Sequence, residues 1–312
     1  MPGLRFGLHT GPQYCTVDDL RTAWHLADER AFDWISIWDH FTPAVMGETR
    51  GPCLEGVAIM TALAAETRNV TIGCLVFCVF YRHPAVLAKA AVTIDHVSGG
   101  RMHIGLGIGW HEAECAAYGL PFPSLKERLD RLDESAVIMR RLFDEQTVTF
   151  AGRYYQLKEA RCEPRPLGRP RIWIGGMGEK RLLRIVAERA DGWNVPFIGP
   201  DVFAQKNAVL TQWCERVGRE PGSIMRTINL GLAIAPDEAG AKRKRAALDE
   251  QFGAMMSFLE PGMLIGTPQQ VIDRVGAYRD AGVERVNLAL RAPFDLDGLA
   301  LFRDRVMPAF AG

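Results

Sequence analysis

The sequence predicts an α/β protein, a (β/α)8 TIM barrel with insertions, and three observations lead to that expectation. Eight segments with the composition of buried strands alternate with helical patterns over nearly all of the 312 residues. Strands that alternate with helices pair in parallel, because each helical crossover returns the chain to the same end of the sheet. Glycines and polar side chains gather where several strands end, which is where barrel enzymes build their active sites.

Apolar segments rich in β-branched and aromatic residues identify the strands. They are expected at residues 4–9, 34–38, 70–76, 101–106, 171–174, 192–195, 225–234 and 284–290. Helices are expected at residues 17–31, 54–67, 85–97, 124–143, 179–189, 202–217, 239–252, 268–281 and 296–306. Thr16 is a suitable N-cap for the first helix, and Pro84 suits the first turn of the third. In 124–143, apolar residues recur at helical spacing.

Residues 147–163 alternate instead around Ala151 and Gly152, as a hairpin does. We therefore expect a hairpin insertion near 145–165 beside a single barrel domain that spans 1–312. The alternative is an open doubly wound sheet, which needs the fingerprint G-x-G-x-x-G after an early strand. The best match begins at Gly105 and has Trp110 where the third glycine belongs.

Composition narrows the function classes. Lys and Arg together number 37, as do Asp and Glu, so a formal net charge of zero gives no support for nucleic-acid binding. The N-terminus lacks the pattern of a secretory signal, and the longest apolar run is about half of a membrane span. We expect a cytoplasmic protein without membrane contact. The seven cysteines are irregularly spaced and no His, Cys and carboxylate cluster has metal-ligand spacing, so no disulfide framework or metal is expected.

The end of the fourth strand carries the sharpest functional signal. Glycine recurs there at every second position: Gly105, Gly107 and Gly109. This leaves one face of the backbone without side chains, so that a flat ligand can lie directly on it. Trp110, His111 and Glu112 follow, an aromatic ring and two groups that can transfer protons. A glycine-rich β-bulge without a ligand is the alternative, and Glu112 could instead cap the next segment.

Two other strand ends carry candidate groups. Asp39 and His40 follow the second strand, where the imidazole can transfer a proton near neutral pH and the carboxylate can hold a polar ligand edge. Alternatively, Asp39 caps a turn and His40 lies on the surface. Four residues that follow the fifth strand and open a helix could bind an anion through bare backbone N–H groups: Gly175, Gly176, Met177 and Gly178. The alternative is a left-handed turn without a ligand.

Six motifs, in this order, resemble the bacterial luciferase-like flavin-dependent family over essentially the whole chain. They are W-D-H-F at 38–41, Y-R-H-P-A-V-L-A-K-A-A at 81–91, T-I-D-H-V-S-G-G-R at 93–101, G-L-G-I-G-W-H-E-A-E at 105–114, I-G-G-M-G-E-K-R-L-L-R-I-V-A-E-R-A-D-G-W-N at 174–194 and G-T-P-Q-Q-V-I-D-R-V at 266–275. The branch that they resemble is the one assigned to the deazaflavin coenzyme F420.

This resemblance implies a homodimeric barrel with the cofactor over the carboxyl ends of the strands. Asp39 would contact the ring, and His40 would face its reactive carbon as a proton donor or as a stabiliser of an anion. A non-prolyl cis peptide near Cys74 and Leu75 would back the ring. The other residues implied in cofactor binding are Gly107 and Gly109 under the ring, the neighbouring Trp110, and Gly175, Gly176, Met177 and Gly178 at the phosphate. His111 and Glu112 remain candidate acid and base groups.

One position departs from the family. Its sugar-phosphate dehydrogenases carry a glutamate general acid where this chain has Trp110, and their basic phosphate-binding cluster is not recognisable here. We therefore expect hydride transfer between F420 and a small, mostly apolar organic substrate, bound near the loops 42–53 and 254–266. One alternative is an FMN-dependent monooxygenase that uses O2, with a separate reductase supplying reduced cofactor. The other is a flavin-binding barrel without catalytic activity.

Overall fold

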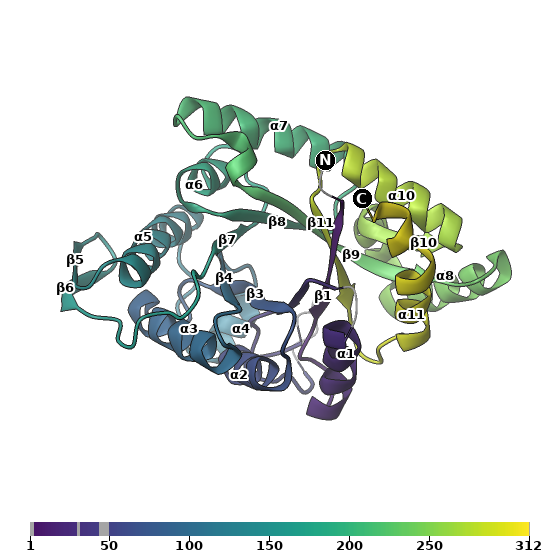
Figure 1. Ribbon diagram of the computed structural model, residues 1–312, viewed down its shortest axis with the longest axis horizontal. Coiled ribbons are helices and arrows are strands. Elements are labelled where there is room, and N and C mark those ends of the chain that lie inside the picture. The colour runs from purple at the N-terminus through teal and green to yellow at the C-terminus, as the bar shows by residue number, and fades with distance from the viewer. Residues whose placement is uncertain (1–2, 30–31, 44–49, 312) are drawn as a thin grey trace.

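The computed structural model describes residues 3–29, 32–43 and 50–311. Within them, eight parallel strands close into a barrel (Figure 1). Around the barrel the strands are β1 (Arg5–Thr10), β2 (Trp34–Ile37), β3 (Thr71–Cys78), β4 (Met102–Gly107), β7 (Ile172–Gly175), β8 (Gly192–Pro196), β9 (Met225–Ile234) and β11 (Arg285–Leu290). Pairing of β8 with β9 and of β11 with β1 completes the ring. The predicted (β/α)8 barrel is confirmed, and the open sheet is wrong.

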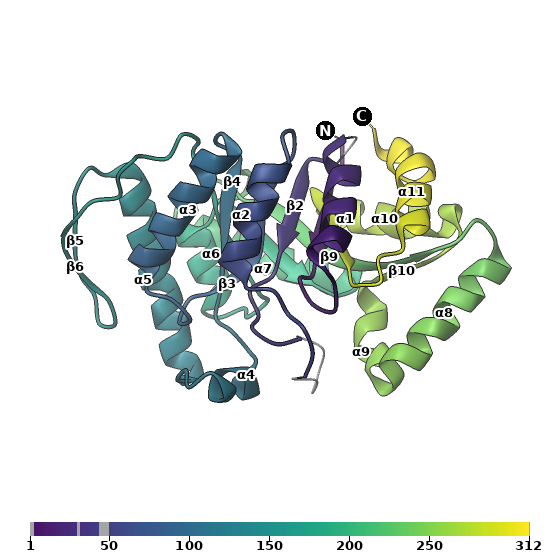
Figure 2. The same cartoon turned by 90° about the horizontal axis from the view of Figure 1, so that it is seen from below.

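Helices surround the barrel (Figures 1 and 2). They are α1 (Val17–Glu29), α2 (Gly56–Glu66), α3 (Pro84–Ser98), α5 (Leu125–Asp144), α6 (Leu182–Arg189), α7 (Pro200–Arg216), α8 (Glu238–Phe252), α10 (Pro268–Asp280) and α11 (Leu296–Arg305). Their apolar faces pack on the strands in a continuous buried core. The helix starts follow local chemistry: Ser124 accepts a hydrogen bond from the backbone N–H of Glu127, and Pro84 begins α3. Residue 31, the expected end of the first helix, lies outside the described residues.

Four elements depart from the expectation. The helix expected at 179–189 begins only at Leu182. A short helix, α4 (Glu112–Ala117), follows β4, and α9 (Met256–Leu259) and β10 (Met263–Gly266) occupy the segment expected to be a loop. β10 pairs with β9 outside the barrel, because β9 is ten residues long and extends beyond its neighbours. The three short elements α4, α9 and β10 have four to six residues each, too few for a periodic pattern to reveal them.

The segment expected to be a hairpin forms a separate two-stranded antiparallel sheet. It consists of β5 (Val148–Ala151) and β6 (Gln156–Ala160), and it projects beyond α5 at the left of Figure 1. Four single turns of 3₁₀ helix complete the described elements: η1 (Pro221–Ser223), η2 (Gly253–Met255), η3 (Glu260–Gly262) and η4 (Met307–Phe310). No helix among the described residues is long and apolar enough to cross a membrane.

An irregularity in β3 explains the glycines of β4. The register between β3 and β4 shifts between Cys74 and Phe77, and the peptide bond between Leu75 and Val76 is cis. A Cβ atom on Gly105 would lie 2.2 Å from the carbonyl oxygen of Cys74, and one on Gly107 would lie 2.2 Å from Cγ2 of Val76. The bare face of β4 is therefore filled by the bulge of β3. The packing interpretation of the glycines is therefore confirmed, and a ligand on this face of the barrel stays a prediction.

We predict that Gly105→Ala destabilises the protein, because its methyl group would collide with backbone that cannot move independently. Overpacking of this kind costs about 1–3 kcal/mol in the free energy of unfolding, which urea denaturation would measure. The matched control is Gly276→Ala in α10, whose Cβ would meet no atom within 4 Å and which should be neutral or slightly stabilising. Equal stability of Gly105→Ala and wild type would contradict the packing described here.

Candidate functional site

The candidate site lies at the carboxyl ends of β2, β3 and β4. Figure 2 shows α4 and α9 on this side of the barrel, at the bottom of the view, whereas the two chain termini lie at the opposite end. Three segments meet here: the residues after Ile37, those after Cys78 and those after Gly107. Their side chains determine what the site can do.

A buried carboxylate, that of Glu114 in α4, connects the three segments. Its Oε2 is 2.9 Å from Nδ1 of His40 and accepts a hydrogen bond from the hydroxyl of Tyr81. Its Oε1 accepts hydrogen bonds from the backbone N–H groups of Phe41 at 2.6 Å and Thr42 at 2.9 Å. Since Glu114 is fully buried, these contacts replace its hydration shell. One side chain therefore fixes the loop after β2 against the ends of β3 and β4.

The environment of Glu114 keeps it ionised. Burial alone would raise the pKa of Glu114, but hydrogen bonds from His40, Tyr81 and the backbone of Thr42 outweigh burial and lower this pKa to about 2. A carboxylate accepts hydrogen bonds only, so the Nδ1 atom of His40 must carry a proton. The imidazole tautomer is thereby set, and Nε2 is left as the nitrogen that can contact a ligand. Among the described residues no group hydrogen-bonds to Nε2.

Aromatic rings surround His40. Trp110 stacks on His111 with 4.9 Å between ring centroids, and its edge meets the His40 ring at 5.5 Å. Trp110 is 54% exposed, so its indole is available to a ligand. His111 is buried and its Nε2 has no hydrogen-bond partner among the described residues, while burial lowers the pKa of His111. His111 is therefore neutral at physiological pH, and its Nε2 could be satisfied by a ligand.

The predicted acid–base residue Glu112 lies differently from Glu114. It is exposed in the first turn of α4, whereas Glu114, two residues later, contacts His40. A helix turns by about 200° in two residues, so the two carboxylates point in opposite directions. The assignments of His111 and Glu112 as acid and base remain predictions, and the structure brings a different carboxylate to His40.

Asp39 forms a second ionic group. Both of its carboxylate oxygens accept hydrogen bonds from Arg82, at 2.8 and 3.0 Å, and the backbone N–H of Cys78 donates to Oδ2 at 3.1 Å. Arg82 also pairs with Glu55. Burial raises the pKa of Asp39, and the charge and hydrogen bonds of Arg82 oppose that shift. Contact between Asp39 and a cofactor stays a prediction, since this side chain already joins β2 to β3.

The bulge of β3 lies beside these groups. Cys74 is fully buried and its burial raises the pKa of the thiol, so it remains protonated and is not a nucleophile. The resemblance implied a cis peptide near Cys74 and Leu75; it joins Leu75 to Val76, one bond further along. Gly175 is part of the same packing, because a Cβ there would lie 2.8 Å from Cγ1 of Val76.

The glycine-rich loop after β7 does not open a helix, which corrects the expectation. Gly175, Gly176, Met177 and Gly178 are followed by a turn, and α6 begins only at Leu182. The backbone N–H of Gly176 donates to the carbonyl of Asn194 at 3.1 Å, and the nearby Arg181 pairs with Asp130. The macrodipole of α6 therefore does not end at these glycines. Met177 is exposed, and binding of a phosphate here stays a prediction.

An apolar pocket of about 310 Å³ opens where β9 and β11 end beside α8. Its lining is mainly apolar and includes Leu232, Leu248, Phe252, Leu259 and Met263. Arg291 connects it to the end of β2: its guanidinium carbon lies 5.6 Å from the ring centroid of Trp38, which immediately precedes Asp39, and 6.0 Å from that of Phe252. The pocket thus belongs to the same face of the barrel as His40.

The two segments that were expected to form the substrate pocket, 42–53 and 254–266, are confirmed only in part. Residues 254–266 contribute Leu259 and Met263 to its lining, as helix and strand rather than as a loop. Of the other expected loop, 42–53, residues 44–49 lie outside the described residues. In the described ranges no group of three or more His, Cys, Asp or Glu side chains could hold a metal ion.

Sequence reasoning missed Glu114, Tyr81 and Arg82. All three lie within motifs that were recognised, at 81–91 and 105–114. A buried carboxylate of this kind is recognisable from sequence only as an acidic residue on the apolar face of a helix, and α4 has six residues, too few to define a face.

We predict that Glu114→Gln lowers the free energy of unfolding by about 1–3 kcal/mol at pH 7, because buried donors lose a charged acceptor. Because the pKa of Glu114 is lower in the folded state than its ordinary value of 4.5, its ionisation stabilises the folded protein at pH values above 4.5. This contribution is lost as the pH falls towards 2. The difference from wild type, measured by urea denaturation, should therefore be smaller at pH 3. The control Glu112→Gln should have no effect, and a Glu114→Gln penalty independent of pH would contradict the account.

Comparison with known proteins gives consistent matches. A family model described as luciferase-like monooxygenase matches residues 4–285. The F420-dependent glucose-6-phosphate dehydrogenase of Kineococcus radiotolerans is 32% identical over 69% of this chain and 64% of its own length, so the match spans just under two thirds of that relative. The protein of the same name from Nakamurella multipartita is 28% identical over 98% of this chain and 96% of its own length.

Solved structures share the fold over nearly their whole length. An F420-dependent secondary alcohol dehydrogenase, in complex with an F420–acetone adduct, superposes with a TM-score of 0.86 at 20% identity and 100% coverage of both chains. A long-chain alkane monooxygenase superposes with a TM-score of 0.84 at 15% identity, covering 99% of this chain and 91% of that one. With a family match over most of its residues, this chain belongs to the luciferase-like monooxygenase family.

Proposed function

We propose that this protein is an oxidoreductase that transfers a hydride between coenzyme F420 and a small, mostly apolar organic substrate. The observation that carries the proposal is the His40 imidazole, held by the ionised Glu114 with Nε2 directed away from it, beside Trp110 and next to the bulge of β3. The names of the relatives support the cofactor, since the matched dehydrogenases from Kineococcus and Nakamurella are F420-dependent.

The residues present fit a flat cofactor. Trp110 offers an exposed aromatic face, and the buried Nε2 of His111 and the buried Nε1 of Trp38 are polar atoms without partners in the described residues. The bulge of β3 would back the ring, with Gly105, Gly107 and Gly175 providing the space that the bulge needs. Gly109 and the loop Gly175–Gly178 would lie along the remainder of the cofactor. When bound, F420 supplies the hydride chemistry, because its ring accepts and releases two electrons together.

In this proposal the protein donates a proton to the substrate and orients the reacting groups. A carbonyl carbon that receives a hydride leaves its oxygen in need of a proton, and we assign this proton to Nε2 of His40. Glu114 acts through His40: its carboxylate keeps a proton on Nδ1, so the proton that is transferred is the one on Nε2. In the opposite direction Nε2 accepts the proton from an alcohol. The ion pair between Asp39 and Arg82 fixes the loop that carries His40 to the end of β3.

The pocket between β9, β11 and α8 supports an apolar substrate. Its lining is mainly aliphatic and aromatic, and its volume of about 310 Å³ is at the lower end for ligand pockets. Trp110 stands where the sugar-phosphate dehydrogenases of the family carry their general acid, which argues against the substrate in the names of the relatives. A small ketone or secondary alcohol fits these observations, and the solved alcohol dehydrogenase of this fold holds an F420–acetone adduct.

The proposal also covers the domain organisation, oligomeric state and location of the enzyme. We infer a single barrel domain over residues 1–312 that works as a homodimer in the cytoplasm. Reduced F420 would come from a separate reductase. The alternative, an FMN-dependent monooxygenase, is supported by the description of the matching family model. The two cofactors differ at ring position five, which is carbon in F420 and nitrogen in FMN. The nitrogen allows reduced FMN to react with O2. NADH, FMN and a flavin reductase would then drive oxygen consumption by this protein.

The function is tested by mixing the purified protein anaerobically with reduced F420 and a panel of small ketones, imines, alkenes and aldehydes, while the absorbance of oxidised F420 is followed. Secondary alcohols with oxidised F420 test the opposite direction. We expect turnover with at least one neutral apolar member, and none with glucose 6-phosphate. Turnover only with the sugar phosphate would contradict the substrate class. Oxygen consumption that requires this protein, in the presence of NADH, FMN and a flavin reductase, would favour the monooxygenase.

We predict that His40→Ala lowers kcat by about 10²-fold or more, because the proton donor is lost, while F420 affinity changes little. Glu114→Gln should lower kcat by about tenfold, since the carboxamide can hold the imidazole in the wrong tautomer. It should also move the pH profile of kcat, which a merely structural substitution would leave in place. Steady-state kinetics with the best substrate, together with fluorescence titration of F420, provide both measurements.

Glu112→Gln is the matched control for these variants, because it makes the same chemical change two residues away on an exposed side chain. It should retain wild-type kcat. Wild-type activity of His40→Ala would show that the proton comes from elsewhere, and a defect of Glu112→Gln larger than that of Glu114→Gln would favour the original assignment of Glu112.

A further inference from the structure

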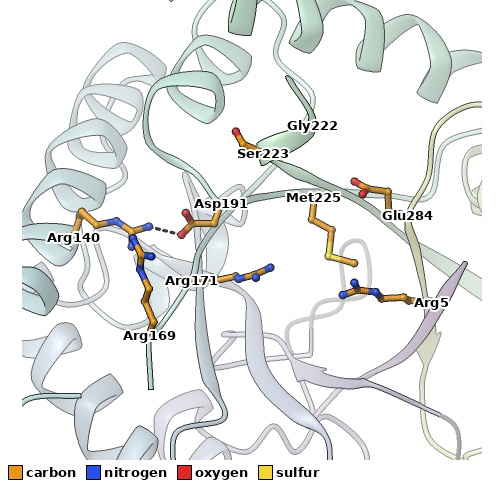
Figure 3. A pocket seen from close by; sticks show the side chains of 9 residues that line it. All are labelled: Arg5, Arg140, Arg169, Arg171, Asp191, Gly222, Ser223, Met225 and Glu284. Carbon is orange, nitrogen blue, oxygen red and sulfur yellow. Dashed lines mark hydrogen bonds and ion pairs between the residues drawn. The ribbon is translucent and has the colours of Figure 1, made fainter. Parts of the chain in front are cut away.

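A second hollow, whose lining side chains are drawn in Figure 3, lies at the amino ends of the strands. His40 follows the carboxyl end of β2, so the hollow lies at the opposite end of the barrel from it. It has a volume of about 540 Å³. Four arginines and two carboxylates line it: Arg5, Arg140, Arg169, Arg171, Asp191 and Glu284. The lining therefore carries a formal charge of four minus two, or +2. Arg171 shows that the two sites are separate, because it precedes β7 whereas Gly175 ends that strand.

The carboxylates of the hollow are already engaged. Asp191 pairs with Arg140, drawn as a dashed line in Figure 3, and its Oδ2 accepts the backbone N–H of Ile172 at 2.8 Å. Glu284 accepts the backbone N–H of Arg226 at 2.7 Å. The side chains of Arg169 and Arg171 have no hydrogen bond or ion pair with any residue that the structure describes, and both residues are exposed. These two arginine side chains therefore carry the positive charge that is available to bind a ligand.

An adjoining hollow contains a third guanidinium group. A smaller hollow of about 310 Å³ shares Arg5, Arg171 and Met225 with the first and reaches Arg285. The guanidinium of Arg285 lies between two indoles, 4.3 Å from the centroid of Trp34 and 4.7 Å from that of Trp173. Arg285 is only 4% exposed, and its Nη2 has no hydrogen-bond partner among the described residues.

A buried guanidinium without a full set of acceptors is costly. Nε of Arg285 donates to Oδ1 of Asn287 at 3.1 Å, and Asp33 contributes the nearest negative charge. Asp33 also lies 3.9 Å from Nε of Arg5. Burial lowers the pKa of Arg285 to about 9, which shows that the existing acceptors do not compensate the loss of water. An anion above Arg285 would supply what is missing.

We propose that this hollow binds a small phosphate-bearing molecule, with its phosphate at Arg171, which lines both hollows, between Arg169 of the larger hollow and Arg285 of the smaller one. The planar fork of arginine matches phosphate oxygens in pairs, and three guanidinium groups from separate positions surround such an anion as one group could not. The volume exceeds that of a phosphate alone, so the rest of the molecule has space towards Met225 and Ser223. The ligand would act away from the reacting atoms, since it lies at the other end of the strands from His40.

The site is tested by titrating the full-length protein with inorganic phosphate, pyrophosphate and citrate at constant ionic strength. Tryptophan fluorescence reports on Arg285, because Trp34 and Trp173 flank it, and thermal unfolding gives an independent measure. We expect saturable binding of phosphate or pyrophosphate. Arg169→Gln combined with Arg171→Gln should weaken it by about tenfold or more, since each loses a charge-assisted hydrogen bond. Both side chains are exposed and unpaired, so the variant should fold normally.

The matched control is Arg153→Gln combined with Arg243→Gln, which removes two exposed charges elsewhere on the surface. It should retain wild-type affinity for the probe. Absence of saturable binding by wild type would overturn the proposal. So would an equal loss in the control, which would indicate nonspecific attraction, or tighter binding of citrate than of either phosphate probe. F420 affinity, measured on the same variants, should be unchanged, so that failure here is distinguishable from failure of the proposed function.

Discussion

The site depends on one buried carboxylate. Glu114 follows β4, yet it holds the loop after β2 through His40, Phe41 and Thr42, and the segment after β3 through Tyr81. Three strand ends that the barrel only brings near each other are thus fixed in one arrangement. Since several donors share the charge, the carboxylate stays ionised despite full burial and imposes a tautomer on His40. The same interaction therefore stabilises this face of the barrel and, in the proposed function, prepares the imidazole for proton transfer.

A second constraint is steric. The bulge of β3 occupies the space that side chains on β4 and β7 would need, so Gly105, Gly107 and Gly175 are required by packing before any ligand is considered. Asp39 and Arg82 then close the gap between β2 and the end of β3 with an ion pair. The wall on which a planar cofactor would lie is built from these internal contacts.

The sequence was sufficient to predict the barrel, because eight apolar segments and their intervening helical patterns are long enough to show their periods. It was also sufficient to place His40, Trp110 and His111 on one face, since strand ends of a barrel converge. It could not predict which carboxylate reaches His40, because Glu112 and Glu114 differ only in which side of a six-residue helix they occupy. The start of α6 was misplaced for a similar reason: the residues after Gly178 are compatible with both turn and helix. The burial of Arg285 could not be predicted either. Its guanidinium lies between Trp34 and Trp173, and these three residues are far apart in the sequence.

The most direct test of the central claim is cofactor preference. The purified apo-protein would be titrated with oxidised F420 and, separately, with FMN while fluorescence is followed. The account predicts tight binding of F420 and weak binding of FMN, as expected for two-electron hydride transfer at the face built around His40 and Trp110. Preference for FMN would contradict the assignment as an F420 enzyme and support an oxygenase, and binding of neither would show that this face is not a cofactor site.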